Sequence, residues 1–165
     1  MSPSAIEVER KWLVRDPPDL SKHEGTAVIQ GYIAIAADGT EVRLRQADGK
    51  FLQTVKSAGG LVRDEIEIEL THDQFEALWR ATAGRRLRKT RYTLPLEGKT
   101  VEIDVYHDSL DGLMVAEIEF TSASVSSQFT PPPWFGPEVT EDRPYKNISL
   151  ALHGRPSPWQ RPPIE

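Results

Sequence analysis

Residues 6 to 14 read IEVERKWLV, and most of their side chains alternate between apolar and charged. On an extended chain, one side carries Ile6, Val8, Trp12 and Val14, and the other carries Glu7, Glu9 and Lys11. A period of two is typical of a β-strand with one buried face. We therefore expect a first strand here, with charges on the face that points away from the apolar core.

The same alternation returns along most of the chain. We expect further strands over residues 26–36, 41–45, 51–56, 62–70, 85–94, 99–106 and 113–121. Pairs such as Asp38-Gly39 and Asp48-Gly49 are typical of hairpin turns between the early strands. Thr71 and Gln74 form a capping-box pattern that predicts a helix ending at Gly84, and a last helix is expected near residues 144–152. The chain is thus predicted to be mainly β with a few peripheral helices.

The composition restricts the class of protein. The 165 residues suit one domain, and no apolar run approaches the roughly 20 residues that span a bilayer. The lack of cysteine excludes disulfides, thiolate metal sites and cysteine nucleophiles. We expect a folded domain over residues 1–154 and a loose Pro-rich tail over residues 155–165. Charge in the first residues, where a signal peptide would be apolar, predicts a cytoplasmic location.

The net charge is −5, from 20 basic against 25 acidic residues. This is the wrong sign for a protein that coats itself in nucleic acid. We expect neither a nucleic-acid nor a membrane partner. Any anion must therefore bind at a local basic site.

Charged side chains share one face on nearly every expected strand. The groups are Glu7/Glu9/Lys11, Arg43/Arg45, Lys56, Glu65/Glu67/Glu69, Lys89/Arg91, Glu102/Asp104 and Glu117/Glu119. For any single strand, a solvated outer face is the simplest reading. Repetition on so many strands instead favours a barrel with this face inward and the apolar faces covered outside. Burying so many charges is too costly unless they pair or bind ligands.

The residue types indicate which ligands such a lumen would bind. Glutamates in Glu-x-Glu spacing project side by side and suit hard cations such as Mg²⁺ or Mn²⁺. Arginine binds phosphate oxygens through paired hydrogen bonds, and lysine does so as a point charge. Together they predict a site for a metal ion and a condensed phosphate.

The opening string resembles the Glu-x-Glu-x-Lys signature of the CYTH superfamily of triphosphate tunnel metalloenzymes. Further matches in family order are VRLR at 42–45, TVKS at 54–57, EIEIEL at 65–70, RKTRY at 88–92, EIDVY at 102–106, AEIEF at 116–120, PPPWFG at 131–136 and YKN at 145–147. They cover roughly residues 4–152 and are most similar to short bacterial inorganic triphosphatases. The resemblance implies a closed eight-stranded antiparallel β-barrel with a charged lumen. It also implies metal-dependent hydrolysis of tripolyphosphate to pyrophosphate and phosphate, and by analogy a homodimer.

The resemblance also implies roles for single residues. The metal ligands would be Glu7, Glu9, Glu117 and Glu119. Phosphate would be held by Lys11, Arg43, Arg45, Lys56, Lys89 and Arg91, with Lys146 as an additional contact. Either metal binding or positioning of the basic side chains would fall to Glu65, Glu67, Glu102 and Asp104.

A candidate catalytic pair is Lys11 with Tyr32. If the two meet, the phenol pKa of about 10 would fall and Tyr32 would help to deprotonate the attacking water. The alternative is a tyrosine that only orients Lys11 or a phosphate. Other substrates on the same fold remain open: thiamine triphosphate, or ATP in a class IV adenylate cyclase. A barrel that binds polyphosphate or nucleotide without catalysis is the alternative from another class.

Overall fold

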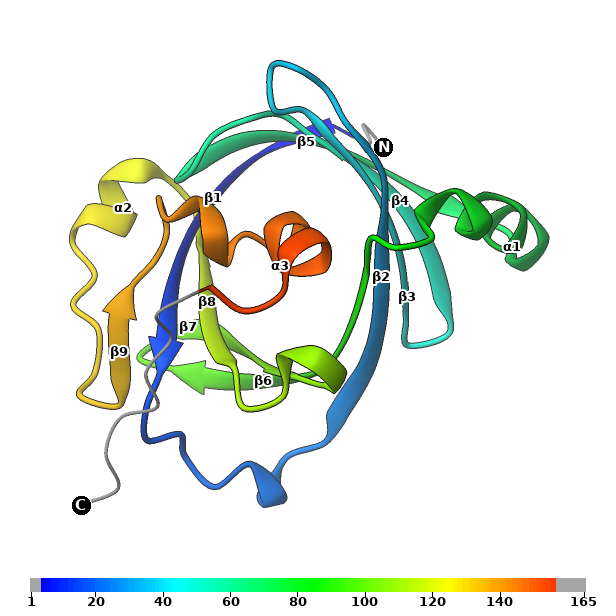
Figure 1. The fold of residues 1–165 in the computed structure, drawn as a ribbon. Helices are drawn as coiled ribbons and strands as arrows, with labels where there is room; N and C mark the ends of the chain where they lie inside the picture. Colours follow the sequence, from blue (N-terminus) through cyan, green and yellow to red (C-terminus); the bar gives the residue numbers. More distant parts are fainter. Residues whose placement is uncertain (1–3, 157–165) are drawn as a thin grey trace.

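A computed structural model describes residues 4–156 and shows a closed antiparallel β-barrel (Figure 1). The barrel strands are β1 (Ser4–Val14), β2 (Gly25–Ile35), β3 (Glu41–Ala47), β4 (Lys50–Lys56), β5 (Val62–Leu70), β6 (Arg86–Leu96), β7 (Lys99–Tyr106) and β8 (Met114–Phe120). Their order around the barrel is β5-β4-β3-β2-β6-β7-β8-β1, and β1 pairs back with β5. The predicted eight-stranded barrel is confirmed.

Strand β1 closes the barrel, because its first half pairs with one strand and its second half with another. Residues 4–8 pair with β5, and residues 8–13 pair with β8. This register sets Glu9 opposite Glu119 and Lys11 opposite Glu117. A ninth strand, β9 (Phe135–Glu138), pairs with the end of β1. The sequence did not predict β9, because the Pro-rich segment before it shows no alternation.

Within residues 4–156, three α-helices accompany the strands. Helix α1 (His72–Trp79) has the predicted capping box but ends before Gly84, in a 3₁₀ turn over Arg80–Thr82. It packs outside the barrel, where Phe75 lies 5.0 Å from the ring of Phe51 on β4. Helix α2 (Ala123–Ser127) also lies outside, whereas α3 (Asn147–His153) lies across the barrel opening in Figure 1.

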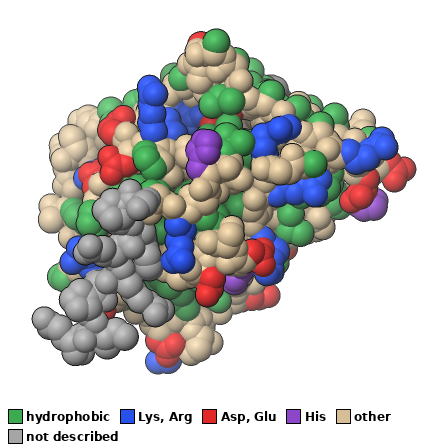
Figure 2. Space-filling view, viewed as in Figure 1, with side chains coloured by type: hydrophobic (Ala, Val, Ile, Leu, Met, Phe, Trp, Pro, Cys, Tyr) green, Lys and Arg blue, Asp and Glu red, His purple; other side chains and the backbone are tan. Residues whose placement is uncertain are grey.

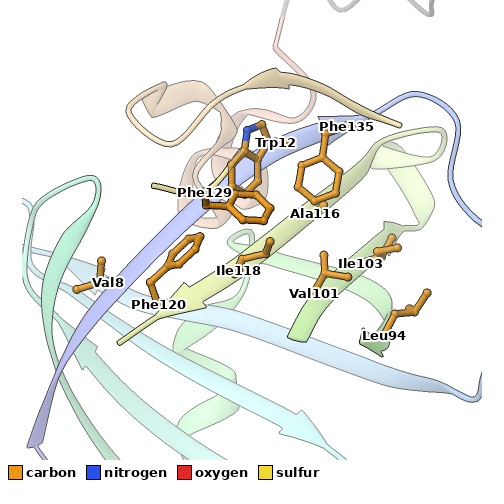
Figure 3. Close-up of a cluster of buried hydrophobic side chains, with 10 residues drawn as sticks. All are labelled: Val8, Trp12, Leu94, Val101, Ile103, Ala116, Ile118, Phe120, Phe129 and Phe135. Atoms are coloured by element: carbon orange, nitrogen blue, oxygen red, sulfur yellow. The ribbon is translucent and has the colours of Figure 1, made fainter. Parts of the chain in front are cut away.

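The main apolar cluster lies on the outer side of β1, β6, β7 and β8, beneath β9 and the end of α2 (Figure 3). Trp12 is 1% exposed and contacts the rings of Phe129 and Phe135, at 5.5 and 4.8 Å between centroids. Because alternate residues point to opposite faces, this outward core leaves the charged residues of the same strands facing inward. The barrel is therefore inside-out, as the sequence predicts.

On the face that Figure 2 shows, basic and acidic side chains are scattered among hydrophobic and other atoms. Within residues 4–156, no helix is long and apolar enough to cross a membrane. Most of the predicted tail, from residue 157 onward, lies outside the described residues.

Candidate active site

The charged faces of the strands enclose a cavity of about 220 Å³. Its lining is entirely charged or polar: Glu7, Glu9, Lys11, Tyr32, Glu41, Arg43, Arg45, Lys56, Arg63, Glu65, Glu67, Arg91, Glu102, Glu117, Glu119, Lys146 and Asn147. Most of the residues that the sequence predicts for the site thus meet in one place. Lys89 and Asp104 are the exceptions.

One wall of the cavity is acidic and holds more negative charge than its neighbours balance. Burial and the nearby Glu117 carboxylate raise the pKa of Glu9 to about 8. The pKa of Glu7 is raised by burial and by a hydrogen bond with Glu65, although Lys56 Nζ lies 2.9 Å from Glu7 Oε1. Burial and Glu7 also raise the pKa of Glu119. Raised carboxyl pKa values mean that a further positive charge here would be stabilised.

Lys11 and Glu117 form an ion pair next to this wall. The distance from Lys11 Nζ to Glu117 Oε1 is 3.3 Å. Burial works against the charged forms of both groups. The carboxylates of Glu117 and Glu9 nevertheless raise the pKa of Lys11, and Lys11 with Arg91 lowers the pKa of Glu117 to about 2. Both side chains are therefore charged at neutral pH.

The other wall carries arginines that lack sufficient anionic partners. Arg45 donates to Gln30 Oε1 from Nε and Nη2, at 3.3 and 3.1 Å, and no carboxylate within residues 4–156 forms a salt bridge with it. Burial and the neighbouring Arg43 and Arg91 lower the pKa of Arg45 to about 10. Arg43 donates to Thr54 Oγ1 at 3.3 Å, and among the described residues its one ion pair is a 3.9 Å contact with Glu67; its buried Nε has no hydrogen-bond partner. This wall has the chemistry of an anion site.

Behind the cavity, Asp104 positions Arg91. Its carboxylate accepts from Arg91 Nε at 2.7 Å and from Nη2 at 2.9 Å, and also from Lys89 Nζ at 2.7 Å. Asp104 and Lys89 are both fully buried. The sequence predicts Lys89 as a phosphate contact, yet it does not line the cavity, because its ammonium group is directed to Asp104.

Tyr32 lines the cavity, but its environment contradicts the predicted lowering of its pKa. Burial and the nearby Glu41 carboxylate raise the phenol pKa well above its ordinary value. The phenol oxygen accepts a hydrogen bond from Gln30 Nε2 at 3.0 Å, and Lys11 is not among the largest influences on its pKa. Tyr32 therefore retains its proton and has a hydroxyl hydrogen available for donation.

Three lining residues were missed from the sequence: Glu41, Arg63 and Asn147. Arg63 Nη2 lies 3.3 Å from Glu41 Oε2, and the pair lies near Lys146, whose Nζ donates to the carbonyl oxygen of Gly59 at 2.5 Å. Glu41 and Arg63 stand at even spacing from Arg43 and Glu65, so extending the alternation by one step predicts them. No comparable pattern marks Asn147.

The acidic wall fits a divalent cation by its donor chemistry. Carboxylate oxygens are the ligands that Mg²⁺ and Mn²⁺ prefer, and a bound cation would displace the protons that the raised pKa values of Glu7 and Glu9 retain. No three acidic or histidine side chains within residues 4–156 are arranged to hold a metal ion by themselves. A cation here would thus need additional oxygen ligands from water or a bound phosphate.

Two curated proteins resemble this chain over most of its length, whereas no family model matches it. An inorganic triphosphatase from Nitrosomonas europaea is 49% identical over 147 residues, which cover 88% of this chain and 97% of that protein. The chain belongs to the inorganic triphosphatase family. An inorganic triphosphatase from Acetivibrio thermocellus is 33% identical, covering 88% of this chain and 92% of that protein.

Solved structures of this triphosphatase family share the barrel. The crystal structure of an inorganic triphosphatase, 46% identical, matches with a TM-score of 0.66 and covers 88% of this chain and 94% of its own. A protein from Pyrococcus horikoshii, only 18% identical, matches with a TM-score of 0.56 over 73% of this chain and 82% of its own, which shows the fold alone. The predicted resemblance to inorganic triphosphatases is confirmed.

Proposed function

We propose that this chain hydrolyses inorganic triphosphate to pyrophosphate and phosphate inside the barrel, with Mg²⁺ or Mn²⁺. One observation carries the proposal: an acidic wall and a basic wall, each with charge that its protein neighbours do not balance, face the same cavity. A cation alone or an anion alone would satisfy one wall. A metal-bound polyphosphate supplies both charges at once.

The size of the cavity favours an inorganic substrate. Its volume of about 220 Å³ lies below the roughly 300–1000 Å³ of sites for drug-sized molecules. A compact chain of phosphates needs no space for a base, a sugar or a thiazolium ring. This argues against thiamine triphosphate or ATP as the main substrate.

In the proposed reaction, the basic wall binds and aligns the phosphates. Arg43, Arg45 and Arg91 would donate to phosphate oxygens, with Lys11, Lys56 and Lys146 as further contacts. The water oxygen attacks the terminal phosphorus as the bridging P–O bond breaks, and pyrophosphate leaves. The water proton passes to a lining carboxylate or to solvent. Such a reaction depends mainly on positioning and on stabilisation of charge.

The metal ion would be held by carboxylates from the set Glu7, Glu9, Glu117 and Glu119, together with oxygen ligands from water or the bound phosphate. When bound, the cation neutralises charge on the phosphate oxygens. Three further acidic residues also pair with basic side chains: Glu65 lies 3.5 Å from Lys56, Glu67 lies 3.9 Å from Arg43, and Glu102 pairs with Arg91. We assign these three to positioning of the basic side chains, together with Asp104.

The test is phosphate release from tripolyphosphate, ATP and thiamine triphosphate with Mg²⁺, Mn²⁺ or EDTA. We expect turnover of tripolyphosphate with metal and none with EDTA. Binding of tripolyphosphate without turnover under every metal condition would identify a binding barrel instead. A preference for an organic triphosphate would refute the substrate assignment.

A cytoplasmic location and a homodimer belong to the same proposal. The dimer is supported by apolar side chains that are exposed on the outer faces of paired strands β1 and β5: Ile6 at 70%, Ile66 at 46% and Ile68 at 46%. Light scattering on the purified chain and on Ile66→Glu tests the dimer, since a monomeric wild type would exclude it.

A further inference from the structure

A second cavity adjoins the first and has about twice its volume. This outer chamber measures about 440 Å³ and lies among the β2–β3 turn, the β4–β5 turn and the segment that leads into α3. Its lining is Ile35, Ala36, Ala37, Asp38, Gly39, Glu41, Ala58, Gly59, Gly60, Glu141, Arg143, Lys146, Ile148 and Ser149. Among the described residues, Glu41 and Lys146 line both cavities, so the junction lies between them.

Two contacts hold the side chains at this junction. Glu41 is 5% exposed and pairs with Arg63 at 3.3 Å. Lys146 Nζ donates to the carbonyl oxygen of Gly59. A third contact lies nearby, where Glu141 Oε1 accepts from the backbone N–H of Leu61 at 3.0 Å. The β4–β5 turn is thereby held against the chain that precedes α3.

The lining of the outer chamber disfavours further phosphates. Its acidic residues, Asp38, Glu41 and Glu141, outnumber Arg143 and Lys146. The rest of the lining is largely apolar. A volume above 300 Å³ with apolar surface and a few polar groups is typical of sites for small organic molecules. The chamber therefore suits an uncharged organic group better than a longer polyphosphate.

We propose that Glu41 determines specificity: its pair with Arg63 bars the organic end of a nucleoside triphosphate from an outer chamber that has room for it. The inference rests on the proposed function, because it takes the three phosphates to occupy the central cavity. The sugar would then have to pass between Glu41 and Lys146. The Glu41 carboxylate obstructs that path and repels the phosphate that carries the sugar, a like-charge contact that disfavours the wrong ligand.

The experiment compares ATP with tripolyphosphate, both as kcat/KM and as binding affinity by calorimetry. Glu41→Ala is expected to raise the ratio of ATP to tripolyphosphate about tenfold or more, because it removes both the obstruction and the charge. Glu41→Gln keeps the size and removes the charge, so it should raise the ratio less. It also covers the case in which Glu41→Ala fails to fold.

A filling variant tests the chamber itself. Ala58→Trp adds a ring at an exposed turn that lines only the outer chamber. Alone, it should leave tripolyphosphate hydrolysis unchanged; combined with Glu41→Ala, it should return the ratio to the wild-type value. The matched control, Ala83→Trp, stands at an exposed position that lines neither cavity and should not reverse the gain.

Two results would overturn the inference: an unchanged ratio in both Glu41 variants, or a raised ratio that Ala58→Trp does not reverse. Failure of the proposed function looks different, since the wild type would then release no phosphate from tripolyphosphate with any metal. The binding ratio still tests the role of Glu41 in that case.

Discussion

Replacing Arg45 with glutamine should stabilise the unliganded protein while weakening substrate binding. Burial and two neighbouring arginines lower the Arg45 pKa to about 10. Below that pH the guanidinium is charged in both the folded and the unfolded chain. The folded state is therefore destabilised by the full free energy of keeping this charge buried beside two other arginines. At about 1.4 kcal/mol per pKa unit, the cost is ~3 kcal/mol.

Part of that gain is offset, because the variant loses the hydrogen bonds from Arg45 to Gln30, worth about 1 kcal/mol. A net gain of ~2 kcal/mol corresponds to a rise of roughly 4–8 °C in Tm for a chain of this size. With tripolyphosphate bound, the wild type should have a higher Tm than Arg45→Gln. A hydrogen bond to a charged group contributes about 1.5–3 kcal/mol, so kcat/KM should fall about 10- to 100-fold.

Thermal unfolding with and without tripolyphosphate, together with phosphate release, measures both effects. The control is Arg88→Gln on β6, because Arg88 is exposed and pairs with the exposed Asp108. It should change neither the Tm nor kcat/KM. A lower Tm for unliganded Arg45→Gln, or retained affinity for tripolyphosphate, would show that Arg45 is balanced by the protein and is not reserved for an anion.

Metal binding should depend on pH, because Glu9 retains its proton up to about pH 8 without metal. Affinity for Mg²⁺ should rise up to about tenfold per pH unit below that value and level off above it; calorimetry in buffers of different ionisation enthalpy measures the released proton, and a flat pH profile would contradict the reasoning. Asp104→Asn should destabilise the fold by about 3–5 kcal/mol in chemical denaturation, because it leaves Lys89 and Arg91 buried without their shared partner. The surface counterpart Asp108→Asn should unfold at the wild-type midpoint, and equal midpoints for both variants would exclude the positioning role. Tyr32→Phe should keep the shape of the pH–rate profile, since the raised phenol pKa leaves no ionisation to lose; disappearance of a basic limb would restore Tyr32 as the proton acceptor.

Most of the fold could be predicted from the alternation of apolar and charged side chains. This alternation predicted all eight barrel strands, because a strand with one apolar and one charged face has the same pattern wherever it lies. It also predicted which residues point inward. It did not predict β9, whose short segment follows three prolines and takes its place from the end of β1.

The alternation did not predict which inward-facing residues line the cavity and which are buried behind it. Lys89 and Arg91 share a face, yet Arg91 reaches the cavity while Lys89 is fully buried at Asp104. That difference depends on partners contributed by other strands, which a single strand cannot reveal. The predicted lowering of the Tyr32 pKa was wrong for the same reason, because burial and Glu41 from another strand outweigh the charges that would lower it.

The pairing of β1 with β8 has a consequence for biosynthesis. Glu9 and Lys11 leave the ribosome early, but their partners Glu119 and Glu117 follow more than a hundred residues later. Until β8 has been synthesised, the acidic and basic walls cannot enclose the cavity, and β1 has one edge without its partner strand. Contacts between such distant segments form slowly. The pocket for phosphate should therefore be the last part of the molecule to mature, so that nascent chains released before residue 120 carry every arginine of the site and yet bind no substrate.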